Sequence, residues 1–121
     1  MRKRTPDALG YHATTMDALP SIADAGLLPN DGTRGFWPDG YDVTGRLFLC
    51  DDLDGARYYA DMIEQGAGPA AILRFPLPGM LRADPMTDGG GGWWTSAPVE
   101  AASIELLVGD RWTPLAGHRA P

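Results

Sequence analysis

The order of the helices and strands that the sequence predicts restricts the fold of this chain of 121 residues more than any other feature. Two units, each a short strand followed by an amphipathic helix, fill the first half of the chain and end near Gln65. From Ala70 onward the hydrophobic residues occur in short runs bounded by turn residues, which is typical of strands. Chains in which helices come early and strands come late fold as α+β domains rather than as doubly wound parallel sheets.

The first unit is a strand at 9–14 and a helix that ends at Gly26. Thr15 or Asp17 can cap this helix. Pro20 is tolerated in the first turn, where its missing N–H has no partner to lose. A glycine at the end of such a helix is typical of a left-handed stop.

The second unit is a strand at 46–50 and a helix at 53–65. Asp51 or Asp52 can cap the helix. At about 100° per residue, one stripe of the helix is apolar. The stripe consists of Leu53, Ala56, Ala60 and Ile63. We expect this stripe to pack against the sheet.

The second half of the chain consists of strands and loops. The predicted strands are 70–76, 80–83, 93–96, 103–108 and 111–115, the last two joined by a hairpin turn at Gly109-Asp110. Two connections, 29–45 and 84–92, are rich in turn residues. Connections longer than about 12 to 15 residues are usually functional or disordered in compact domains.

Composition narrows the class of protein. Sixteen acidic residues against ten basic ones give a formal net charge of −6, which disfavours broad binding to nucleic-acid backbones. The single cysteine, Cys50, excludes an internal disulfide and is interpreted as a small buried hydrophobic residue. No apolar run approaches the ~20 residues that span a bilayer, and the N-terminus lacks a secretory signal. We predict one domain over 1–121, with its core at about 8–115, in the cytoplasm and without a membrane partner.

Polar and aromatic side chains gather at the ends of the two units. The first strand reads Tyr11-His12-Ala13-Thr14-Thr15 and so ends in an imidazole and hydroxyls. On the second helix, Tyr59 lies at the edge of the apolar stripe and Tyr58 points away from it. A polar strand end that faces an aromatic helix is typical of a pocket for a flat ring that carries an amide. Two alternatives stay open. The histidine can be only a polar cap of the strand, and Tyr59 can be a core residue with a solvated hydroxyl.

These segments together resemble the ADP-ribosyltransferase fold, and more narrowly its diphtheria-toxin-like and PARP-like branch with a His–Tyr–Glu triad. The segments that carry the resemblance are Tyr11-His12-Ala13-Thr14, Leu47-Phe48-Leu49-Cys50-Asp51, Ala56-Arg57-Tyr58-Tyr59-Ala60 and the late segment from Trp93 to Ile104. The resemblance covers roughly residues 8–108. It implies an α+β fold in which β-α-β-α is followed by several strands that form a split mixed or antiparallel sheet.

The resemblance implies an enzyme of the glycosyltransferase class that uses NAD as a substrate and transfers ADP-ribose as nicotinamide leaves. The departure builds positive charge on the ribose, so the site must orient the ring and stabilise an oxocarbenium-like centre. His12 would bond a ribose hydroxyl and the backbone near it, Thr14 would bond a second hydroxyl, and Tyr59 would stack on the nicotinamide. The NAD-binding set implied by the resemblance is His12, Ala13, Thr14, Phe48, Tyr58 and Tyr59.

The catalytic glutamate of the family has no match in this sequence. Counting back from Pro98 places the family's acid at or near Gly92, where the chain has no acid. Asp88, Glu100 and Glu105 are the candidate substitutes.

Among these substitutes, Glu100 completes a candidate catalytic set with His12 and Tyr59. No metal ligands are predicted. The unmatched acid also leaves room for the related RNA 2′-phosphotransferase chemistry, which uses NAD without that glutamate and needs several arginines to hold phosphate.

The sequence thus predicts a small NAD-dependent mono-ADP-ribosyltransferase-like protein that modifies a protein or nucleic-acid target, in the manner of a bacterial or phage effector or toxin. Residues 29–45 and 85–92 would select the acceptor. The alternative is a catalytically altered or inactive module that binds NAD, ADP-ribose, a nucleotide or a protein partner. A third reading is a structural or interaction domain that keeps only the scaffold.

Overall fold

The computed structural model describes residues 9–29, 45–77, 81–83 and 92–116. The strands are β1 (Leu9–Thr15), β2 (Leu47–Cys50), β3 (Ala70–Pro76), β4 (Arg82–Ala83), β5 (Gly92–Thr95), β6 (Glu105–Val108) and β7 (Arg111–Pro114). The helices are α1 (Leu19–Ala25) and α2 (Leu53–Gly66), with short 3-10 turns η1 (Met16–Ala18) and η3 (Ala101–Ser103). The predicted α+β class is confirmed.

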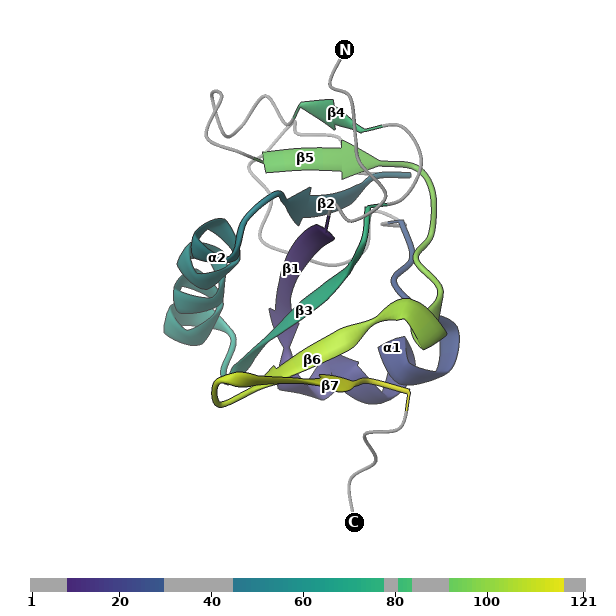
Figure 1. Ribbon diagram of the computed structural model, residues 1–121. Coiled ribbons are helices and arrows are strands. Elements are labelled where there is room, and N and C mark those ends of the chain that lie inside the picture. Colours follow the sequence, from purple (N-terminus) through teal and green to yellow (C-terminus); the bar gives the residue numbers. More distant parts are fainter. Residues whose placement is uncertain (1–8, 30–44, 78–80, 84–91, 117–121) are drawn as a thin grey trace.

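The strands form one sheet in the order β4-β5-β2-β1-β3-β6-β7, and every pairing is antiparallel. Figure 1 shows β4, β5 and β2 above β1, β3, β6 and β7, with α2 beside one end of the strands and α1 near η3. None of the described helices is long and apolar enough to cross a membrane.

The two groups of strands meet at a narrow junction between β1 and β2. β1 pairs with β3 along its whole length, from Leu9 opposite Pro76 to Thr15 opposite Ala70. Its pairing with β2 has a single register, Tyr11 opposite Cys50. Beyond this pair, β1 and β2 are no longer paired. We call this opening between the two strands the split.

The main core lies on one face of this sheet. Residues directly opposite each other in an antiparallel ladder point to the same face. The buried core cluster joins β2, β3 and β6 to α1 and to the segments around Leu27 and Val99, which are bridged to each other. Its members are Leu19, Ile22, Leu27, Leu47, Leu49, Ala71, Leu73, Phe75, Val99, Ile104, Leu106 and Leu115.

A smaller apolar layer lies on the other face, beneath α2. Ala56 of α2 and Ile72 of β3 are buried there, and neither belongs to the main core cluster. A Cβ added to Gly55 would lie 3.2 Å from the Cβ of Cys50, which fixes the face of that cysteine. Cys50, the one cysteine of the chain, is buried, as predicted.

The beginning of α2 follows the sequence prediction, whereas the beginning of α1 does not. The Asp52 carboxylate caps α2 by accepting from the Gly55 N–H at 2.7 Å. Neither Thr15 nor Asp17 caps α1 through its side chain, because the chain first forms η1 and Ala18 then takes the N-cap position. Gly26 ends α1 with a positive φ of 83°.

The last two strands differ from the prediction at two boundaries, one of which is that β7 ends at Pro114 and not at Leu115. The hairpin turn at 109–110 is present, with Gly109 at a φ of 65°. The predicted strand at 103–108 begins only at Glu105, because Ser103 ends η3 and bonds the Glu100 carbonyl through both its N–H and its hydroxyl. Most of the two expected acceptor loops, and Asp88, lie outside the described residues.

Candidate functional site

Beyond the Tyr11–Cys50 pair, backbone groups of β1 face the split, and Ala13 is the first residue whose groups do so. The Met16 N–H donates to the Pro69 carbonyl at 2.9 Å and so extends the β1–β3 ladder by one residue. Because backbone groups alternate in direction along a strand, even-numbered residues of β1 bond β3 and odd-numbered ones face β2. Tyr11 is paired there with Cys50, but no described strand pairs with Ala13 on that side. The N–H and C=O of Ala13 therefore point into the split.

The His12 side chain bridges the same split. Its Nδ1 lies 2.7 Å from the Phe48 carbonyl oxygen, so Nδ1–H donates and, in the neutral ring, Nε2 carries the lone pair. The imidazole thus replaces a backbone donor where β1 leaves β2. Burial lowers the pKa of His12, and the hydrogen bond to Phe48 raises it by a smaller amount. The ring is therefore neutral near neutral pH.

The two expected halves of the site lie on opposite faces of β1. His12 is opposite Leu73 on the face of the main core, and Thr14 shares that face because it lies two residues further along the strand. The Ala13 side chain is on the face of α2, as is Phe48, two residues before Cys50 in β2. The imidazole and the phenols thus do not share one face of the sheet.

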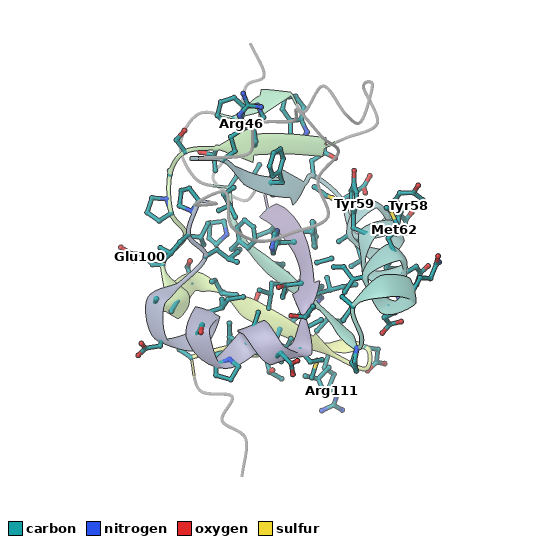
Figure 2. All side chains as sticks on the ribbon, turned by 180° about the vertical axis from the view of Figure 1, so that it is seen from behind. Arg46, Tyr58, Tyr59, Met62, Glu100 and Arg111 are labelled. Carbon is teal, nitrogen blue, oxygen red and sulfur yellow. The ribbon has the colours of Figure 1, made fainter. Side chains whose placement is uncertain are left out.

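The two tyrosines of α2 differ in exposure. Tyr58 is 64% exposed, whereas Tyr59 is half-buried at the edge of the apolar stripe. Their rings meet edge to face, with centroids 5.4 Å apart. Figure 2 shows both tyrosines and Met62 gathered on the same stretch of α2. Tyr59 is the better candidate for a stacking wall, because Tyr58 stands out into solvent.

The structure does not bring Glu100 to this place. Glu100 is exposed and precedes η3, and Figure 2 shows it on the opposite side of the molecule from Tyr58 and Tyr59. Glu105 is instead held in the sheet, where it accepts from the Arg74 guanidinium at 2.6 Å. Neither carboxylate is placed to act with the tyrosines.

Sequence reasoning missed two contacts close to the split. Gly92, where the resemblance would place an acid, is opposite Cys50. Asp51, which follows β2, accepts a hydrogen bond from the Trp93 indole N–H at 3.1 Å. The guanidinium carbon of Arg46 lies 4.5 Å from the centre of the Trp94 ring. These residues come together only through the register of β2 against β5. They are more than 40 positions apart in the sequence, so no local pattern predicts their contact.

Among the described residues, no three His, Cys, Asp or Glu side chains gather as ligands for a metal ion. Comparison of the chain with protein-family models and with curated proteins gave no match.

Proposed function

We propose that the chain binds the nicotinamide end of NAD, or of a related nicotinamide nucleotide, at the split between β1 and β2. The observation that supports this proposal is the orientation of the Ala13 backbone, whose N–H and C=O face β2 where no described strand pairs with them. A primary carboxamide offers one acceptor and one donor in the same plane. It therefore matches the two backbone groups of a single residue on an open strand edge.

The neighbouring side chains fit the parts of such a ligand. His12 is anchored through Nδ1, so its Nε2 lone pair can accept a hydrogen bond from a ribose hydroxyl. Phe48 and Tyr59 supply aromatic faces on the α2 side of the split, against which a pyridine ring can stack. The Thr14 hydroxyl is a further donor on the His12 side.

Binding is better supported than transfer. ADP-ribosyl transfer needs a negative charge beside the ribose as nicotinamide leaves. Gly92 supplies none, and Glu100 is on the far side of the molecule. Asp51 directly follows Cys50, which is paired with Gly92, and is therefore the acid nearest in sequence to that pair. The resemblance implies transfer of ADP-ribose to a macromolecular acceptor, and this activity would depend on Asp51.

Calorimetry and a nicotinamide-release assay test the proposal on the same protein. We expect nicotinamide and NAD to bind the wild type and to bind His12→Ala more weakly, with Glu100→Gln unchanged as the matched control. Release of nicotinamide from NAD that is lost in Asp51→Asn would establish the enzyme. Binding without release would establish the module, and absence of both signals would refute the proposal.

A further inference from the structure

The solvent face of α2 carries two large apolar side chains close together. Tyr58 is 64% exposed and Met62 is 51% exposed. They are four residues apart and are therefore neighbours on the surface of the helix. The other large hydrophobic residues that are exposed in the described part of the chain lie singly in η1, after α1 and in β6, and they are Met16, Leu28 and Val108. Single exposed apolar residues are normal on protein surfaces, so the pair on α2 is the one that indicates a contact surface.

The Tyr58 ring is supported by its neighbour in the chain. Its centroid lies 5.4 Å from that of Tyr59, and the two rings meet edge to face. Tyr59 is half-buried at the edge of the apolar stripe, and Figure 2 shows both rings and Met62 on the same stretch of α2. An edge-to-face contact holds a ring without covering both of its faces. Tyr58 therefore still offers aromatic surface to a partner.

Two carboxylates flank Tyr58 along the helix. Asp54 lies four residues before it and Asp61 three residues after it, and both are exposed. Neither carboxylate makes a hydrogen bond or an ion pair with another described residue. At a rise of 1.5 Å per residue, the two acids are about 10 Å apart along the axis of α2. We call Asp54, Tyr58, Asp61 and Met62 the α2 strip.

The charge of the α2 strip favours a basic partner. The cation of this helix, Arg57, lies about 100° around the axis from Tyr58 and about 140° from Met62, so it is outside the strip. The formal net charge of −6 and the two acids of the strip repel a second copy of the chain, a nucleic-acid backbone and an anionic lipid surface. Arginine and lysine, by contrast, pair with carboxylates, bind the face of an aromatic ring and cover apolar surface with their aliphatic stems.

We propose that the α2 strip binds a basic amphipathic helix of another protein, an interaction that goes beyond the proposed nicotinamide site. A helix with two arginines seven residues apart places them about 10 Å apart, which is the separation of Asp54 and Asp61 along α2. Leucines three and four residues after the first arginine lie between the two cations on the same face, where they can pack against Tyr58 and Met62.

Three synthetic peptides of equal length serve as probes in ¹⁵N–¹H titrations. The first is helical, with arginine at positions i and i+7 and leucine at i+3 and i+4. The second has glutamate in place of both arginines, and the third has a central proline that breaks the helix but keeps the charge. We expect the first peptide to bind with shifts centred on the amides of the α2 strip, and the other two to bind at least about fivefold more weakly. Added salt should weaken the binding of the first peptide.

Matched variants assign the binding to the strip. Asp54→Asn/Asp61→Asn should bind the first peptide at least about fivefold more weakly, whereas Asp17→Asn/Asp24→Asn, with the same change of charge on η1 and α1, should bind it like the wild type. Tyr58→Ala should lose about threefold in affinity, and Tyr58→Phe should keep it, because the ring and not the hydroxyl makes the contact. Leu28→Ala, which removes a similarly exposed apolar side chain, is the control for Tyr58→Ala.

Four results would overturn the proposal. The first is a wild type that does not bind the arginine peptide, and the second is equal loss of affinity in the two double variants. The third is equal binding of the helical and the proline peptides, which would make the occupant an extended basic segment. The fourth is self-association of the wild type in sedimentation that is lost in Tyr58→Ala, which would make the occupant a second copy. Thermal unfolding of each variant confirms that it is folded.

Discussion

Replacement of His12 by alanine should lower the free energy of unfolding by about 1–3 kcal/mol. The imidazole donates to the Phe48 carbonyl at 2.7 Å in a partly buried place. Loss of one such hydrogen bond costs about 0.5–1.5 kcal/mol when water replaces the donor, and about 1–3 kcal/mol when the carbonyl is left without a partner. His12→Gln keeps an N–H donor and should lose less than His12→Ala.

The effect of His12 should also depend on pH. Burial lowers the pKa of the folded imidazole below its ordinary value of 6.5. Between that ordinary value and the lower folded pKa, the unfolded chain binds more protons than the folded one. Stability contributed by the neutral imidazole is therefore complete above about pH 6.5 and is lost as the pH falls toward the folded pKa.

Urea unfolding of the wild type, His12→Ala and His12→Gln between about pH 8 and pH 5.5 measures both effects. The other histidine, His118, and the carboxylates are common to all three proteins. The stability of the wild type relative to His12→Gln should be constant above about pH 7 and should fall below it. Equal stability of the wild type and His12→Ala, or a wild-type–glutamine difference that does not change with pH, would refute the role assigned to this ring.

Three further substitutions test the fold that carries the site. Gly26→Ala should lower the free energy of urea unfolding by more than about 3 kcal/mol, because φ is positive there and the new Cβ would meet the Val99 carbonyl oxygen. Gly109→Ala is the control, since φ is also positive but the space around it is open, and it should cost only about 1–2 kcal/mol. Leu73→Ala should lower the unfolding free energy by about 2–5 kcal/mol, because the side chain is fully buried behind the split. Arg74→Lys should cost about 1 kcal/mol in thermal unfolding, because lysine cannot form the flat stack in which the Arg74 guanidinium carbon lies 4.4 Å from the centre of the Trp112 ring. A loss of stability no larger than that caused by Arg111→Lys would contradict this prediction.

Local features of the fold could be predicted from the sequence. The apolar stripe and the capping aspartate located α2, and Gly109-Asp110 located the last hairpin, because short-range patterns determine helix faces and tight turns. The start of α1 could not be predicted in the same way. Thr15 continues β1 instead of capping the helix, since the Met16 N–H is drawn into the ladder with Pro69.

The candidate site was predicted only in part. The residues at the end of β1 were singled out, and the expected bond of His12 to nearby backbone is present. Their division between two faces follows from the register of β1 against β3, and the distance of Glu100 from the tyrosines follows from the path of the chain through η3. Both depend on pairings between strands far apart in sequence, which no local pattern specifies.

The amide resonance of Ala13 during a titration with nicotinamide tests the central claim most directly. If the carboxamide binds the open edge of β1, the Ala13 N–H signal in a ¹⁵N–¹H spectrum should move downfield and saturate with the binding curve. The Thr14 N–H, which is directed toward β3, should move far less and serves as the internal control. Saturable binding that leaves Ala13 unmoved, or no binding at all, would contradict the account.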